Sequence, residues 1–196
     1  KGMPYSDAIE KLKFWFKKLE ITHWWSKRVE ELSKGMAQKI QFVVTVIHQP
    51  KLLIFDEPFS GFDPINAAII REEILQLREN GTTIIFSTHR MESVEEICDH
   101  IALINNAKTI LEGPIDKIKN DFQTETYEVV LSRGKLTGNN QFSIISENNN
   151  IYKIKLNTGC SSSHLLESIT KEHEIISFKK DFPSVEDIFI KSINNE

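Results

Sequence analysis

Residues 52–58, Leu-Leu-Ile-Phe-Asp-Glu-Pro, form a continuous apolar run that ends in two carboxylates. Continuous apolarity, in place of alternation, is typical of a strand buried on both faces, as in a parallel sheet. Further along, the sequence predicts a helix over residues 65–79 that stops at Asn80-Gly81, and then a second buried strand over residues 82–87. This succession of strand, helix and strand predicts an α/β layer with a parallel sheet.

Polar side chains follow both predicted strands at the point where each strand ends. Asp56 and Glu57 close the first run, and His89 lies just beyond the second. Ligands of open α/β sheets sit beyond the carboxyl ends of the strands. A carboxylate there is costly without a cation or hydrogen bonds, and Mg²⁺ with a phosphate is a common solution. A second carboxylate can polarise a water for attack, and a histidine can donate to the charge that develops on phosphate.

Two helices are predicted before the first strand. One covers residues 7–19 with Ser6 as its N-cap, and the other begins after Ser33. Ser33 and Gly35 lie at the start of the second helix, where free N–H groups and the helix dipole face an anion. Taken singly, each feature has a structural explanation: Ser-x-Gly is a cap, an Asp-Glu pair is a turn, and a lone histidine packs.

Four of these segments, in this order, resemble the motifs of the ABC ATPase family. Residues 32–36, Leu-Ser-Lys-Gly-Met, resemble its signature motif, and residues 52–57 resemble its Walker B strand. Residues 60–63, Ser-Gly-Phe-Asp, resemble its D-loop, and His89 resembles its switch histidine. The resemblance covers about residues 1–118 and implies part of a P-loop NTPase sheet with a helical subdomain remnant, acting on ATP with Mg²⁺.

The resemblance also implies a role for each site residue. Asp56 would hold Mg²⁺ through water, Glu57 would be the general base, and His89 would contact the γ-phosphate of ATP. The family works as a head-to-tail dimer with a second ATPase subunit. Ser33 and Gly35 would therefore contact ATP held by that subunit, and Asp63 would couple the two sites across the interface.

The sequence departs from the family pattern in two ways. Lys34 and Met36 replace a glycine and a glutamine of the usual signature. In addition, no Gly-x-x-x-x-Gly-Lys-[Ser/Thr] phosphate loop (Walker A) is present, because no two of the eight glycines have the required spacing. That loop normally precedes the signature, and the sequence starts with Lys1, so a truncated subunit that does not hydrolyse ATP by itself is expected.

From residue 121 onward the pattern changes, which predicts two domains, 1–120 and 121–196. The second is an α+β module whose predicted strands and helices cover residues 126–131, 142–146, 151–156, 163–170, 175–179 and 185–193. Residues 117–125 are predicted to be a linker. Residues 182–189, Phe-Pro-Ser-Val-Glu-Asp-Ile-Phe, resemble the C-terminal extension of bacterial export-type ATPases.

Composition and charge exclude several kinds of partner and site. The 196 residues carry a net charge of -4 with no basic stripe, so nucleic acid is not expected. Cys98 and Cys160 form no metal-binding or redox motif. No apolar stretch reaches the roughly 20 residues that span a bilayer. These features, with the resemblance, predict the ATPase subunit of a transporter, preferentially an exporter. It would be cytoplasmic, bound to the inner face of the cell membrane through a separate transmembrane permease. The alternatives are an ABC-type ATPase in a non-transport role and a non-catalytic regulatory or binding fragment.

Overall fold

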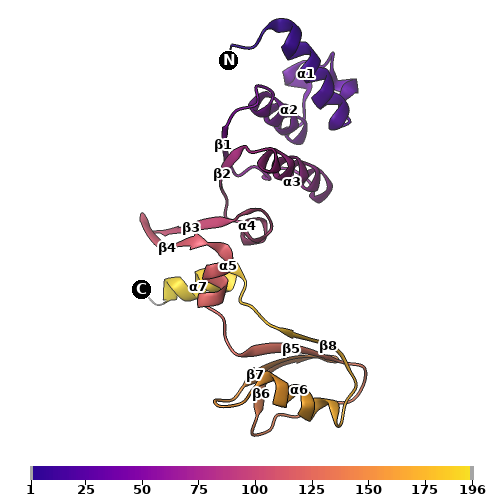
Figure 1. The fold of residues 1–196 in the computed structure, drawn as a ribbon. Helices are drawn as coiled ribbons and strands as arrows, with labels where there is room; N and C mark the ends of the chain where they lie inside the picture. The colour runs from indigo at the N-terminus through magenta and orange to yellow at the C-terminus, as the bar shows by residue number, and fades with distance from the viewer. Residues whose placement is uncertain (1, 195–196) are drawn as a thin grey trace. The chain divides into compact units, whose positions relative to one another are not determined.

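The computed structural model describes residues 2–194, and the chain divides into two compact units, Lys1–Arg90 and Met91–Glu196. In the first unit, strands β1 (Leu52–Asp56) and β2 (Thr83–Ser87) pair in parallel. Its helices are α1 (Tyr5–Lys18), α2 (Lys34–Val46) and α3 (Pro64–Glu79), with 3₁₀ turns at Thr22–Trp24 and Val29–Glu31 (Figure 1).

Local chemistry explains where these helices begin and end. Ser33 caps α2, because its Oγ accepts a hydrogen bond from the N–H of Met36 at 3.4 Å. Helix α3 ends at Glu79 with Asn80 as its C-cap, and the next residue, Gly81, has a φ of 90°, the left-handed conformation that favours glycine. The predicted cap of α1 is wrong: Pro4 holds the N-cap position and Ser6 lies inside the first turn.

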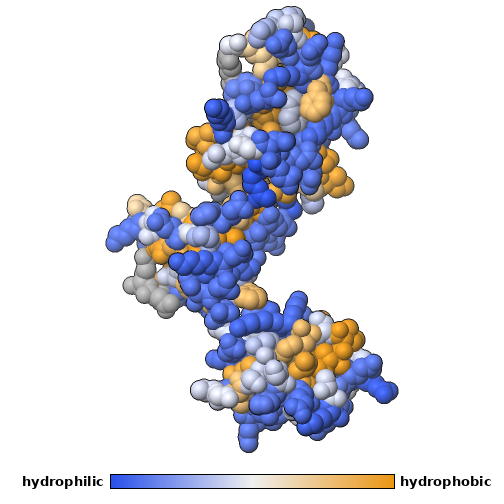
Figure 2. Space-filling view, viewed as in Figure 1, coloured by the Kyte–Doolittle hydropathy of each residue, from blue (hydrophilic) through white to orange (hydrophobic). Residues whose placement is uncertain are grey.

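The predicted parallel pairing is correct, but the prediction that both strands are buried on both faces is wrong. Leu53 is 2% exposed, whereas Leu52, Ile54 and Ile85 are 48%, 69% and 55% exposed. Helices cover one face only, where Phe55 stacks on Phe42 of α2 at 6.1 Å between ring centroids. Figure 2 shows the apolar surface that results over the β1–β2 pair. A continuous apolar run shows that a strand can be buried on both faces. It does not show whether other helices or strands cover each face.

The second unit contains a β-hairpin packed with three helices. Strands β3 (His100–Asn105) and β4 (Lys108–Pro114) are antiparallel, and they turn through Asn106 and Ala107 with positive φ. The helices are α4 (Met91–Ile97), α5 (Ile115–Asp121) and α7 (Val185–Asn194). Helices α5 and α7 share a buried cluster with the hairpin, and Met91 and Val94 of α4 pack against it while partly buried. The cluster is made of Ile101, Leu103, Ile115, Ile118, Val185 and Ile188.

The same unit also contains a four-stranded antiparallel sheet in the order β6-β7-β5-β8. Its strands are β5 (Thr126–Leu131), β6 (Phe142–Asn148), β7 (Ile151–Leu156) and β8 (Ile175–Lys180), and helix α6 (Ser162–Thr170) packs on one face. The sequence predicted all of these elements to within two residues. Alternating apolar residues fill the core between sheet and helix, among them Val129, Leu131, Tyr152, Ile154, Leu165 and Ile169.

Helix α7 packs against residues on the other side of the domain boundary predicted at 120/121. The sequence assigned this helix to the second domain, yet its Val185 and Ile188 are fully buried in the cluster that includes Ile101 and Ile118. The predicted linker, residues 117–125, is also helical over its first part, because Ile118 belongs to α5 and is buried. The division into 1–120 and 121–196 therefore stays a prediction.

Candidate functional site

The ends of β1 and β2 meet, and they bring Asp56, Glu57 and His89 together as the sequence predicted. Asp56 is the register partner of Ser87, and the Ser87 hydroxyl donates to Asp56 Oδ1. The backbone N–H of Glu57 donates to the carbonyl oxygen of Ser87 at 2.9 Å. The parallel ladder therefore fixes the positions of both carboxylates relative to the second strand.

Glu57 is the centre of a hydrogen-bond network. Its Oε1 accepts from the backbone N–H of His89 at 2.9 Å and lies 2.7 Å from His89 Nδ1, while its Oε2 accepts from the Thr88 hydroxyl at 3.2 Å. Burial acts to raise the pKa of Glu57, but the hydrogen bonds from His89 and Thr88 and the charge of His89 lower it below its ordinary value. The carboxylate is therefore ionised at neutral pH.

The backbone at Glu57 is strained. Its φ of 46° lies in the left-handed region, which a residue with a long side chain rarely adopts. Such strain persists where surrounding contacts enforce it, and it concentrates at functional sites. Here the backbone bond to Ser87 and the side-chain bonds to Thr88 and His89 hold the residue in place.

His89 is bound on one side and open on the other. Its Nδ1 meets Glu57, while 78% of its side-chain surface is exposed. The hydrogen bond at Nδ1 leaves Nε2 as the ring atom that can reach a ligand. The sequence analysis did not predict Ser87 and Thr88 as site residues. Their positions were a usable signal, because Ser87 ends the second apolar strand and Thr88 directly precedes the predicted site residue His89.

Asp56 fits a magnesium ion that is held largely by water and phosphate. A carboxylate has about four lone-pair positions, so the bond from Ser87 leaves room for a metal-bound water. Mg²⁺ is usually held by one or two carboxylates, several waters and substrate phosphates. Among residues 2–194, no group of three or more His, Cys, Asp or Glu side chains could hold a metal by itself. The donor set therefore suits Mg²⁺ that arrives with a nucleotide.

Ser33, Gly35 and Asp63 form a second group, at the starts of α2 and α3. A Cβ added to Gly35 would lie 3.6 Å from the carbonyl oxygen of Gly61, so the loop before α3 packs closely on the first turn of α2. Asp63 caps α3: its Oδ1 accepts from the N–H of Asn66 at 3.0 Å, and its Oδ2 accepts from the Asn66 amide. These bonds from Asn66 lower the pKa of Asp63 below its ordinary value.

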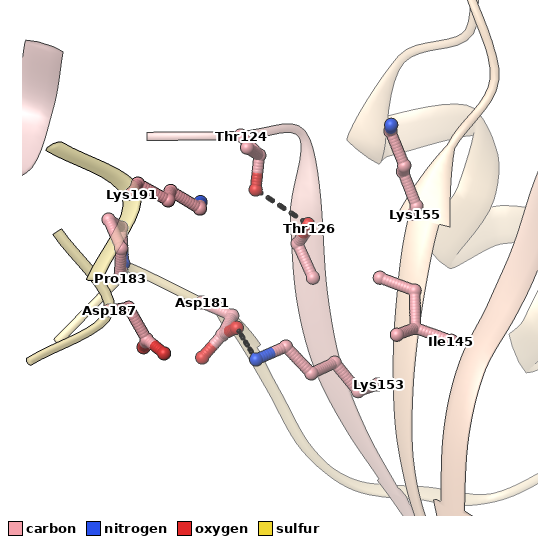
Figure 3. A pocket seen from close by; sticks show the side chains of 9 residues that line it. All are labelled: Thr124, Thr126, Ile145, Lys153, Lys155, Asp181, Pro183, Asp187 and Lys191. Atoms are coloured by element: carbon pink, nitrogen blue, oxygen red, sulfur yellow. Dashed lines mark hydrogen bonds and ion pairs between the residues drawn. The ribbon is translucent and has the colours of Figure 1, made fainter. Parts of the chain in front are cut away.

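Two hollows in the second unit contain none of the six predicted site residues. One, of about 260 Å³, is lined by side chains from β5, β6, β7 and α7 and by the segment after β8 (Figure 3). Its lysines and aspartates partly neutralise each other, since Lys153 Nζ lies 2.6 Å from Asp181 Oδ2. The other, of about 330 Å³, is lined mainly by glutamates of α4 and α7. The candidate site is therefore at the strand and helix ends of the first unit.

Comparisons with known proteins indicate the family to which the chain belongs. Residues 113–193 match the family model "ATP-binding protein DrrA1-3-like, C-terminal domain", and residues 14–95 match an AAA domain model. An uncharacterized ABC transporter ATP-binding protein of Alkalihalophilus pseudofirmus is 35% identical over 98% of this chain and 73% of its own length. The linearmycin resistance ATP-binding protein LnrL of Bacillus subtilis is 27% identical over 95% of this chain and 70% of its own length.

The fold agrees with solved structures as well. The ATP-binding subunit of an ABC transporter superposes with a TM-score of 0.57 and 28% identity, covering 62% of this chain. The chain spans half of that solved chain. This likeness confirms the predicted P-loop NTPase fold of the ABC ATPase type.

None of the helices described within residues 2–194 has the length and apolar character that a membrane span requires.

Proposed function

The chain belongs to the family of ABC transporter ATP-binding proteins, and on this premise we propose that it supplies the hydrolytic residues of a transport ATPase. Glu57 is the general base that orients and deprotonates the attacking water, and His89 contacts the γ-phosphate. Asp56 would hold Mg²⁺ through water. When bound, Mg²⁺ would neutralise charge that develops on the phosphates.

One observation carries the proposal: the Glu57 carboxylate is fixed by Thr88 and His89 at the ends of two parallel strands. Phosphoryl transfer requires positioning and electrostatic stabilisation more than covalent chemistry. A carboxylate with three bonds to the neighbouring strand end is positioned in this sense. The lowered pKa of Glu57 keeps the carboxylate ionised, which is the form that can accept a proton from water.

Ser33, Gly35 and Asp63 form the contact to a second ATPase subunit. The start of α2 offers N–H groups to an anion. ATP bound by the partner subunit is the anion that fits. The assembly also includes a separate transmembrane permease, and the direction of transport is export. Export is supported by the likeness to the fluoroquinolones export ATP-binding protein of Mycobacterium tuberculosis, which is 38% identical over 45% of this chain and 30% of its own length.

The test is the substitution Glu57→Gln in the intact ATPase subunit. The amide keeps the shape of the side chain but cannot accept the proton, so kcat should fall at least about 100-fold while ATP still binds. Glu79→Gln, which changes an exposed glutamate at the end of α3, is the matched control and should keep wild-type kcat. Near-normal turnover of Glu57→Gln would remove the general base from the proposal.

A further inference from the structure

The side chain of Gln38 joins α2 to the loop before α3. Gln38 lies one turn into α2, and its Nε2 donates a hydrogen bond to the carbonyl oxygen of Ser60. The next residue, Gly61, has a φ of 83°, and a Cβ there would lie 2.7 Å from Gln38 Oε1 and 3.0 Å from Lys34 Cε. The left-handed conformation therefore favours glycine at residue 61, and a larger side chain there would displace the Gln38 amide.

The other amide atom of Gln38 has no partner. Its Oε1 is buried, and no donor among the described residues makes a hydrogen bond to it. A buried polar atom without a hydrogen bond destabilises the folded state, so an apolar side chain of the same length would serve packing alone better. Turning the amide over would place oxygen against the Ser60 carbonyl and lose the one bond that Gln38 makes. Gln38 therefore keeps its bond to the loop at a cost in stability.

The two segments that Gln38 joins are those of the proposed subunit contact. Ser33 and Gly35 stand at the start of α2, and Ser60 begins the loop that ends at Asp63. Gly35 also approaches this loop, at Gly61, so two contacts tie the segments together. The Gln38 amide therefore links the first turns of α2 to the loop that leads to Asp63.

We propose that Gln38 is a positioning residue that makes the α2 start and the loop 60–63 move as one body during turnover. The inference rests on the proposed function, because it assigns Gln38 to the same subunit contact. Gln38 itself does not touch nucleotide. It keeps the anion-facing N–H groups and Asp63 in a fixed relation, and displacements of about 1 Å at such positions lower rates up to 100-fold.

The test compares Gln38→Met with Gln41→Ala in the intact subunit. Methionine keeps the length of the side chain and removes both the bond to Ser60 and the orphan oxygen. Gln41 is an exposed residue of the same helix. For Gln38→Met we expect an unchanged or higher melting temperature, kcat about 10-fold lower and a KM for ATP within about 2-fold of wild type. Amide hydrogen exchange in the loop 60–63 should be faster in Gln38→Met. Gln41→Ala should leave kcat and the exchange rate of the loop at their wild-type values.

Normal kcat and normal loop exchange in Gln38→Met would overturn the proposal. If that variant does not fold, Gln38→Glu is the second variant, since its carboxylate has the same length and cannot donate to Ser60. A stable Gln38→Glu with wild-type kcat would overturn the proposal equally. Failure of the proposed function is distinguishable, because it would appear as retained activity in Glu57→Gln whatever Gln38 does.

Discussion

The parallel pair β1–β2 and the four-stranded antiparallel sheet use their apolar side chains in opposite ways. In the antiparallel sheet, Ile154 is fully buried against α6, and its neighbours on the strand face the other side. In the parallel pair, Ile54 is 69% exposed, and the polar site residues Glu57 and His89 lie just beyond the strand ends. The antiparallel sheet completes a core of its own, whereas the parallel pair holds Glu57 and His89 at its end and leaves one face uncovered.

The largest expected effect is a difference in stability between alanine substitutions of Ile154 and Ile54. Ile154→Ala should lower the free energy of unfolding by about 2–5 kcal/mol, because it leaves a cavity in a closed core. Ile54→Ala should change it by less than about 0.5 kcal/mol, because the side chain is already in contact with solvent. Urea denaturation followed by circular dichroism measures both. Equal losses would contradict the contrast between the two sheets.

The second effect concerns the predicted module 121–196. Expressed alone, it should fold its four strands and α6, whose core lies wholly within residues 127–169. Helix α7 should lose its structure, because Val185 and Ile188 pack with residues before 121. The amide NMR spectrum should be dispersed for the sheet and collapsed for residues 185–194. A dispersed spectrum for α7 would support the domain boundary at 120/121.

Sequence predicts the antiparallel sheet better than the parallel pair for a physical reason. Alternation along Tyr152 to Leu156 defines both the strand and its buried face, since one side must meet a core. The run Leu52–Phe55 defines a strand but not its covering layers, and its burial was mispredicted. The proximity of Glu57 and His89 was predictable, because each follows a strand of the parallel pair. The bond of Thr88 to Glu57 and that of Gln38 to Ser60 depend on side-chain geometry that spacing does not reveal.

A smaller effect concerns acid stability. The folded pKa of Glu57 is lowered, so its contribution to stability is present above its ordinary value of 4.5 and is lost as pH falls through the folded pKa. Lys180 and Tyr127 lower the pKa of Glu125 in the antiparallel sheet, but this side chain is 59% exposed and more screened.

Substituting each carboxylate tests this difference. Glu57→Gln should flatten the dependence of melting temperature on pH below 4.5 more than Glu125→Gln does. The melting temperatures of the two variants and of the wild type, measured at each pH, check the prediction. A larger change in Glu125→Gln would place the stronger carboxylate interaction in the antiparallel sheet.

The smallest effect on stability, with a large effect on activity, is expected at Ser33. Aspartate is as good an N-cap as serine, so Ser33→Asp should keep the free energy of unfolding within about 0.5 kcal/mol. If Ser33 only caps α2, activity is kept too. If the start of α2 faces the γ-phosphate held by a partner subunit, the added negative charge repels that phosphate. ATPase activity and ATP-driven dimerisation then fall, while ATP affinity of the monomer is unchanged.

Measuring the melting temperature and the ATPase rate of the same Ser33→Asp preparation separates the two roles. Ser161 offers a matched control, because it caps α6 through the N–H of His164 at 3.3 Å and lies in the antiparallel region. Ser161→Asp should leave both stability and ATPase rate unchanged. Lost activity in Ser33→Asp alone would assign a phosphate-facing role to the α2 start, because the two substitutions make the same change to a helix cap. Retained activity in both would reduce Ser33 to a cap and remove the subunit contact from the first unit's site.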